Sequence, residues 1–252
     1  MIDFEVADGC ATIQLNRPPV NAINDAWLAR FHMILNELEV RDDIRLMHVK
    51  SELKSFCAGM DLERIKTLFE MEDGSSAMVG DVSEFQRLFA RIEAAPFVSL
   101  AEIAGTALGG GLELALSCDL RVASTKAKLG LPETGLGLIP GAGGTQRLTR
   151  LCGRGTAGRV ILSAEILSGS AAAELGIVQW AIEPGLLEAG VRDIITRITR
   201  LAPAAVREAK MLIAAAGDPE RDGYFEEREA DRRLFAHEDT RGRIGAFLAG
   251  SR

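Results

Sequence analysis

A run of glycines directly after an apolar segment constrains the fold of this chain more than any other feature. Residues 97–103 are mostly apolar and have the length of a buried β-strand. Three glycines, 109–111, then break the chain, and the apolar residues 112–118 have the pattern of a buried helix. A buried strand followed by a tight turn and a buried helix is typical of α/β proteins.

The rest of the chain extends this prediction. Alternating apolar positions in residues 2–16 predict a β-hairpin, and residues 44–50 predict a further strand. Asn24 is the expected N-cap of the helix that follows it. Helical patterns dominate after about residue 145. We therefore expect an α/β core domain over residues 1–195 and a helical, oligomerising region over residues 196–252.

Composition excludes several classes of protein. The 29 Lys and Arg against 36 Asp and Glu give a net charge of −7, which argues against a general nucleic-acid binder. No apolar run approaches the roughly 18 residues of a membrane span, and the first residues do not resemble a secretory signal. The four cysteines form no C-x-x-C pair and the three histidines are scattered. We expect no metal site, no membrane or nucleic-acid partner, and reduced thiols in the cytoplasm.

The first candidate catalytic group is Glu113, which follows the glycine turn. A helix that begins at such a turn directs free N–H groups at a bound oxyanion, and glycines let a ligand approach the backbone. The segment contains no phosphate-binding motif. Because the neighbours of Glu113 are apolar, burial would raise the pKa of its carboxyl and suit it to proton transfer. The alternative is a tight turn with an exposed glutamate in the first helical turn.

The second candidate is Glu133, which lies in the Gly/Pro-rich segment 130–144. Taken alone, Glu133 is better interpreted as a turn or N-cap residue. Two carboxylates in glycine-rich, apolar surroundings are harder to explain by structure alone. A pair of carboxyl groups in different environments can divide the roles of acid and base between them.

These segments together resemble the signatures of the crotonase (enoyl-CoA hydratase/isomerase) superfamily, almost from end to end. The resembling segments are residues 16–22, 56–62, 107–119 and 130–148, with Phe247 and Leu248 in the position of the family's terminal helix. The resemblance implies a crotonase-like spiral of ββα units with a helical C-terminal trimerisation region. It also implies assembly as a homotrimer or a homohexamer, a dimer of trimers.

The resemblance also implies roles for individual residues. The backbone N–H groups of Ala58 and Gly110 would form an oxyanion hole for the thioester oxygen of an acyl-CoA. Glu113 would accept a proton from the attacking water, and protonated Glu133 would deliver a proton to Cα. No cofactor is implied beyond the coenzyme A of the substrate. The residues expected to contact that substrate are Ala22, Ala58, Gly59, Met60, Asp61 and Gly110.

Because hydratases of the family carry both glutamates, we expect hydration of 2-trans-enoyl-CoA to 3-hydroxyacyl-CoA, a step of lipid and fatty acid metabolism. Two alternatives stay open. A Δ3-Δ2 enoyl-CoA isomerase could work with Glu133 alone, and a non-catalytic acyl-CoA-binding protein would need neither Glu113 nor Glu133.

Several residues carry weaker indications. Glu102 is unexpected inside a strand and is expected to pair with a buried arginine or contact another subunit. Arg207 and Lys210 are candidates for contacts to the phosphates of coenzyme A, or parts of a solvated helix face. Cys57 is expected to pack rather than react. Residues 62–80, which shape the acyl pocket in relatives, are expected to be mobile.

Overall fold

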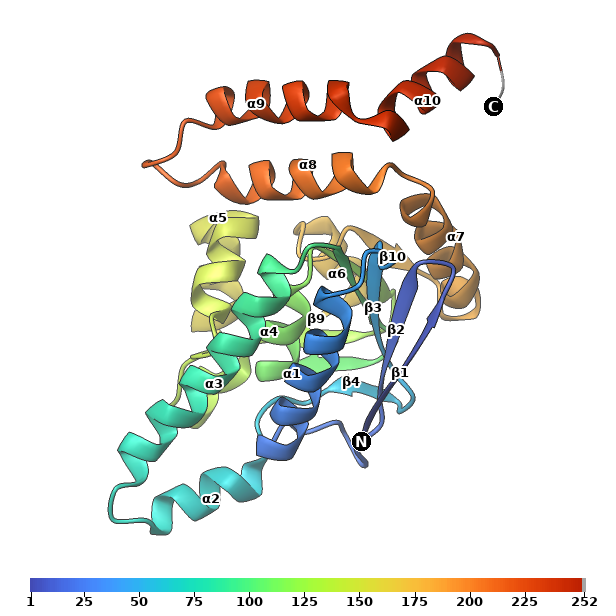
Figure 1. Cartoon of the computed structure of the whole chain (residues 1–252). Helices are drawn as coiled ribbons and strands as arrows, with labels where there is room; N and C mark the ends of the chain where they lie inside the picture. The colour runs from blue at the N-terminus through green and yellow to red at the C-terminus, as the bar shows by residue number, and fades with distance from the viewer. Residues whose placement is uncertain (251–252) are drawn as a thin grey trace.

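Two β-sheets organise the computed structural model, which describes residues 1–250 (Figure 1). The larger sheet has the strand order β1-β2-β3-β5-β7-β10. Its strands are β1 (Ile2–Ala7), β2 (Cys10–Leu15), β3 (Leu46–Ser51), β5 (Val98–Ile103), β7 (Leu120–Ser124) and β10 (Trp180–Ile182). The smaller sheet has the order β4-β6-β8-β9. Its strands are β4 (Ser55–Cys57), β6 (Thr106–Leu108), β8 (Lys128–Gly130) and β9 (Ile166–Ser168).

A repeated ββα unit links the two sheets. In each of the pairs β3/β4, β5/β6 and β7/β8, one strand enters the larger sheet and the next enters the smaller one, and a helix follows. Successive units pair in parallel within both sheets. The helices of this region are α1 (Asp25–Glu39), α2 (Leu62–Glu70), α3 (Gly74–Ala94), α4 (Gly110–Ser117), α5 (Gly144–Leu162) and α6 (Gly169–Glu174), with the 3-10 turn η1 (Pro132–Leu136).

The larger sheet is packed on both faces. On one face a large core contains the apolar stripes of α1 and α3, with Trp27 against Phe31 and Phe85 against Phe89. On the other face α7 (Leu187–Thr199), which follows the 3-10 turn η2 (Pro184–Leu186), forms a second core with strand residues. Burial on both faces explains the nearly continuous apolar runs of the central parallel strands.

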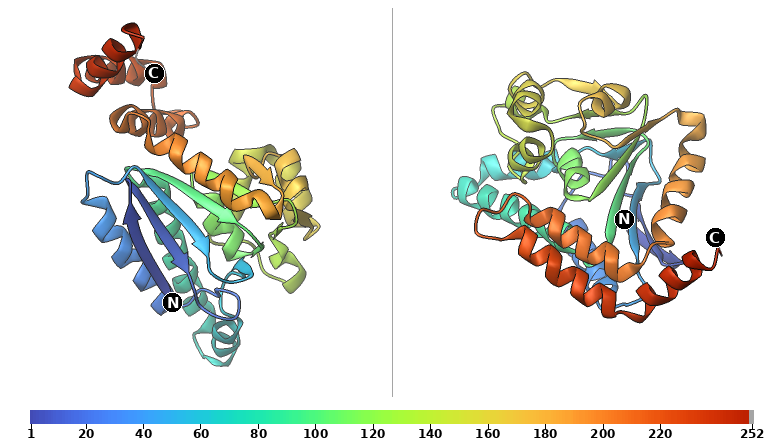
Figure 2. Two further views of the ribbon diagram at one scale, coloured as in Figure 1. Left: turned by 90° about the vertical axis from the view of Figure 1, so that its right-hand side faces the viewer. Right: turned by 90° about the horizontal axis from the view of Figure 1, so that it is seen from above.

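The C-terminal part is helical, as predicted. It consists of α8 (Pro203–Ala215), α9 (Gly223–Ala236) and α10 (Glu238–Leu248), with α9 and α10 set away from the sheets (Figure 2). The expected boundary between residues 195 and 196 falls inside the continuous helix α7, whose buried face packs against the larger sheet. Lys210 fastens α8 to the core because its Nζ lies 2.8 Å from Asp119 Oδ2.

Other sequence predictions have clear outcomes. The hairpin of β1 and β2 is confirmed, and the Asn24 side chain caps α1 by accepting from the Trp27 N–H. Residues 62–80, expected to be mobile, are mostly helical in α2 and the start of α3. The partner of Glu102 is not an arginine but the buried His48, whose Nε2 lies 2.8 Å from Glu102 Oε2. Within residues 1–250, every helix is too short or too polar to cross a membrane.

Candidate active site

The carboxyl ends of three neighbouring parallel strands bring the predicted site residues together. Strand β4 leads to Met60, β6 leads to the glycines before α4, and β8 leads to Glu133 in η1. The ends of parallel strands are a common place for ligand sites because the connecting loops converge there. The site is therefore a product of the ββα repeat.

Two backbone N–H groups face the site without an acceptor. Among residues 1–250, neither Met60 nor Gly110 donates its N–H to any protein atom. A Cβ atom on Gly110 would lie 3.5 Å from the Met60 nitrogen, so the two groups are close neighbours. Gly110 is also the first residue of α4, where the helix dipole favours negative charge.

The assignment of Ala58 as an oxyanion donor is wrong for this structure. Its N–H donates to the Val20 carbonyl oxygen over 3.0 Å and is not available to a ligand. That bond anchors the loop before α1 to the end of β4. The chain then turns at Gly59, with φ of +90°, and Met60 follows with an N–H that has no acceptor among the described residues.

Glu113 is a buried carboxyl group, only 2% exposed, on the first turn of α4. Its Oε1 accepts a hydrogen bond of 2.7 Å from the Gly144 N–H. Burial raises the pKa of Glu113 to about 7, although the hydrogen bond from Gly144 and the positive charge of Arg147 favour the carboxylate. A carboxyl group that titrates near neutrality is suited to exchanging protons with a substrate.

Glu133 lies close to the glycine turn that precedes Glu113. A Cβ atom on Gly109 would lie 3.0 Å from Glu133 Oε1, and Gly109 has φ of +53°, a conformation that favours glycine. Glu133 Oε2 is buried and has no hydrogen-bond partner among the described residues. Burial raises the pKa of Glu133 as well. The two carboxyl groups interact electrostatically, and the negative charge of Glu133 further raises the pKa of Glu113.

Comparison with known proteins assigns the chain to a family. The family model for enoyl-CoA hydratase/isomerase matches residues 5–247. The chain belongs to the enoyl-CoA hydratase/isomerase family. It is 42% identical to the Bacillus subtilis homologue YngF, with 94% of this chain and 90% of that protein covered. It is 34% identical, with the same coverage, to the short-chain-enoyl-CoA hydratase of Clostridium acetobutylicum.

Solved structures confirm the crotonase-like fold. An enoyl-CoA hydratase structure from Geobacillus kaustophilus aligns with a TM-score of 0.93 at 29% identity, covering 100% of this chain and 94% of that one. An enoyl-CoA hydratase from Bacillus anthracis aligns with a TM-score of 0.90 at 34% identity, covering 99% and 96%. The α/β fold and helical C-terminal region expected for this enoyl-CoA hydratase/isomerase family member are therefore present.

The other expected binding residues of this family member have structural partners. Asp61 caps α2 by accepting from the Glu63 N–H and forms an ion pair of 2.7 Å with Arg17. The same arginine donates to the Ala22 carbonyl oxygen. Cys57 packs as expected: its thiol donates to a backbone oxygen, and burial raises its pKa to about 12. These contacts hold the loop of residues 16–22 against the end of β4.

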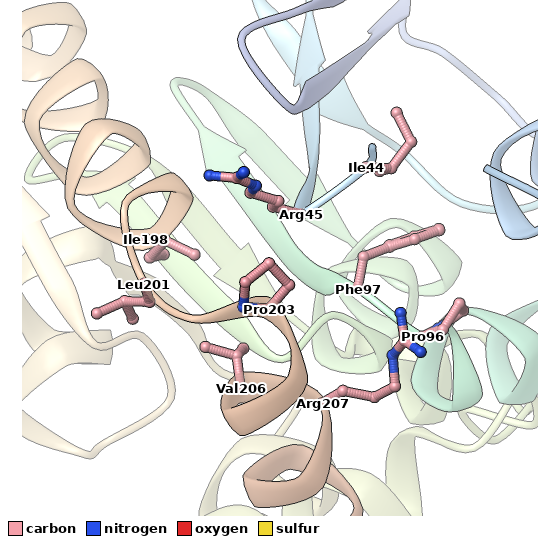
Figure 3. Close-up of a pocket in the computed structure, with 9 residues that line it drawn as sticks. All are labelled: Ile44, Arg45, Pro96, Phe97, Ile198, Leu201, Pro203, Val206 and Arg207. Carbon is pink, nitrogen blue, oxygen red and sulfur yellow. The ribbon is translucent and has the colours of Figure 1, made fainter. Parts of the chain in front are cut away.

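The two candidate phosphate contacts lie elsewhere. Lys210 is paired with Asp119 and also donates to the Phe97 carbonyl oxygen, so its charge is already neutralised within the chain. Arg207 lines a small cavity where α8 meets the segments that lead into β3 and β5 (Figure 3). This cavity is at the amino ends of those strands, whereas the glutamates follow the carboxyl ends of β6 and β8.

Sequence reasoning missed two contributors to the site. The Gly144 N–H binds Glu113, and the Arg147 guanidinium lies against Gly143, with a charge that lowers the pKa of Glu113. The sequence signal that could have indicated the Gly144 contact is the pair Gly143-Gly144 before a helix, because a glycine pair permits a close approach of backbone to a carboxylate. Within residues 1–250, no group of three or more His, Cys, Asp or Glu is placed to hold a metal ion.

Proposed function

We propose that this protein hydrates 2-trans-enoyl-CoA to 3-hydroxyacyl-CoA. The observation that carries the proposal is a pair of carboxyl groups near the glycine turn: Glu113 is buried, and Glu133 is half-buried, with its Oε2 shielded and its Oε1 close to Gly109. Relatives named as short-chain-enoyl-CoA and crotonyl-CoA hydratases support the same reaction. No cofactor is required in this proposal, because coenzyme A is part of the substrate.

The free N–H groups of Met60 and Gly110 would bind the thioester oxygen. When water adds to Cβ, negative charge develops on that oxygen, and the two donors stabilise it. A single donor of this kind contributes about 3–4 kcal/mol to transition-state stability. The position of Gly110 at the start of α4 adds the favourable field of the helix dipole.

The different surroundings of the glutamates divide the proton transfers between them. Glu113 accepts the Gly144 N–H and lies near Arg147, and both favour its charged form, so it serves as the base for water. Glu133 Oε2 lacks a hydrogen-bond partner in the protein and is free to deliver a proton to Cα. Two negative charges in one apolar site are costly, which favours a single shared proton.

A Δ3-Δ2 enoyl-CoA isomerase is the alternative enzyme. It moves one proton between two carbons and could use Glu133 alone. Glu113 would then have no role in the reaction. A non-catalytic acyl-CoA-binding protein would need neither the buried Glu113 nor the half-buried Glu133, and removing carboxyl groups from water is unfavourable. The presence of both favours the hydratase.

The test is turnover of crotonyl-CoA, followed by loss of the enoyl-thioester absorbance and by product mass. We expect addition of one water by the wild type and a loss of roughly 10²–10⁴-fold in kcat for Glu113→Gln and for Glu133→Gln. Glu174→Gln, an exposed glutamate on α6, is the matched control. An isomerase would convert a 3-enoyl-CoA and retain activity in Glu113→Gln. A binding protein would turn over neither substrate.

We also propose that the enzyme assembles as a homotrimer or homohexamer in the cytoplasm. Large apolar side chains are widely exposed along α9 and α10 and would be covered by another subunit. They include Tyr224, Phe235, Phe247 and Leu248, each at least 76% exposed. All four cysteines are free thiols, which suits a reducing compartment. Sedimentation or light scattering measures the assembly directly.

A further inference from the structure

In the loop of residues 141–144, which binds Glu113, the carbonyl oxygens of residues 141–143 all accept hydrogen bonds. Gln86 on α3 donates to the Gly141 oxygen over 2.7 Å, and Arg147 Nη1 donates to the Ala142 oxygen over 2.8 Å. The Gly143 oxygen accepts the Arg147 N–H over 2.8 Å. With these oxygens held, the next N–H, that of Gly144, is directed at Glu113 Oε1.

Arg147 is the central contact of this loop. Its side chain is 10% exposed and lies over Gly143, where a Cβ atom would lie 3.1 Å from the guanidinium carbon. Its Nε and Nη2 bind the same carboxylate oxygen of Glu93 on α3 at 3.0 and 2.7 Å. Glu93 is 44% exposed, and its hydrogen bonds to Arg147 connect it to the loop that binds Glu113.

We propose that Glu93 and Arg147 are positioning residues: the ion pair fixes the guanidinium on the Ala142 oxygen, and this holds the Gly144 N–H on Glu113. The consequence for catalysis rests on the proposed hydratase function, in which Glu113 is the base. A loop released from Arg147 would lose the hydrogen bond that stabilises the Glu113 carboxylate. Neither residue touches the substrate in this scheme.

The charged groups around Glu113 determine the direction in which its pKa should change when Glu93 is replaced. The neighbouring charged groups are Glu133, whose charge raises the pKa of Glu113, and Arg147, whose charge lowers it. Cys57, which packs against Gly111, has a neutral thiol because burial raises its pKa to about 12. If Glu93 acted only as a charge, its removal would lower the pKa of Glu113, since a negative charge would be lost. If Glu93 acts by positioning Arg147, its removal raises that pKa.

The experiment is a carbon NMR titration of enzyme labelled at the glutamate carboxyl carbons, with the Glu113 signal identified by its absence in Glu113→Gln. The variants are Arg147→Met, Arg147→Lys and Glu93→Gln. Arg159→Gln is the matched control, because Arg159 on the same helix forms an exposed ion pair with Glu165. Circular dichroism establishes that each variant is folded.

We expect Arg147→Met to move the Glu113 titration midpoint upward by about one pH unit. Glu93→Gln is expected to move the midpoint in the same direction by less, Arg147→Lys to recover part of the wild-type value, and Arg159→Gln to leave it unchanged. A midpoint that is unchanged or lower in Glu93→Gln overturns the proposal, and Glu93→Gln folds readily because the residue is half exposed. Crotonyl-CoA turnover is measured on the same samples. A wild type without hydration would reject the proposed function and leave the titration result intact.

Discussion

Gly59 and Gly110 meet backbone to backbone, so that a Cβ atom on Gly59 would lie only 2.8 Å from the Gly110 nitrogen. Gly59 also has φ of +90°, a conformation that residues with a side chain rarely adopt. This contact brings the free N–H of Met60 next to the free N–H of Gly110. The spacing of the two proposed oxyanion donors therefore depends on the absence of two side chains.

Gly59→Ala is expected to separate the two donors. The added methyl group must displace the start of α4, so we expect kcat for crotonyl-CoA to fall by about 10²-fold or more, as for the loss of one oxyanion donor. Backbone strain should lower the free energy of unfolding by about 1–3 kcal/mol. The control is Gly80→Ala, because Gly80 lies in α3 with nothing within 4 Å of an added Cβ. Equal activity of the two variants would contradict the assignment of the donors.

The pH dependence of hydration should report on Glu113. The base must be ionised, and burial raises its pKa from 4.5 to about 7. We expect kcat/KM to fall as the pH is lowered through about 7, because the base is then protonated. A profile that is flat down to the pKa of an ordinary glutamate would show that Glu113 is not the base.

The same raised pKa predicts that Glu113 destabilises the fold at neutral and higher pH. Between pH 4.5 and about 7 the folded state binds a proton that the unfolded state has released, so wild-type stability decreases as the pH rises through this window. Glu113→Gln removes this dependence. Its unfolding free energy relative to wild type should increase by about 3 kcal/mol between about pH 4 and about pH 8. Urea unfolding across this range tests the prediction, and parallel curves would refute it.

Lys210 should contribute to stability rather than to substrate binding. Its Nζ binds Asp119 and the Phe97 oxygen, and its side chain is 13% exposed. We expect Lys210→Met to lower the free energy of unfolding by about 1–3 kcal/mol, because Asp119 loses a charged partner. The KM for crotonyl-CoA should change little. The comparison variant is Arg192→Met on α7, an exposed pair whose loss should cost at most about 1 kcal/mol. A large rise in KM alone would restore the phosphate-contact interpretation.

Much of the fold follows from local sequence. The hairpin of β1 and β2, the N-cap at Asn24 and the buried helix α4 all arise from patterns within a few residues, since side-chain periodicity and caps act locally. The helices within residues 62–80 do not follow from local sequence, because the Gly and Ser residues of this segment interrupt the helical pattern. Packing and the Arg64–Asp81 ion pair hold α2 against α3 across that interruption.

The chemical groups of this protein can be predicted from its sequence: two glutamates in apolar surroundings, glycines at the strand ends, and the family signatures that contain them. Which N–H groups are free depends on the tertiary structure, because a hydrogen bond between Ala58 and Val20, distant in the chain, removes one candidate donor and leaves Met60. The tertiary structure likewise pairs Glu102 with His48 and directs the Gly144 N–H at the Glu113 carboxylate. The physical reason is that hydrogen-bond partners and burial depend on what packs nearby in space, which a local pattern does not contain.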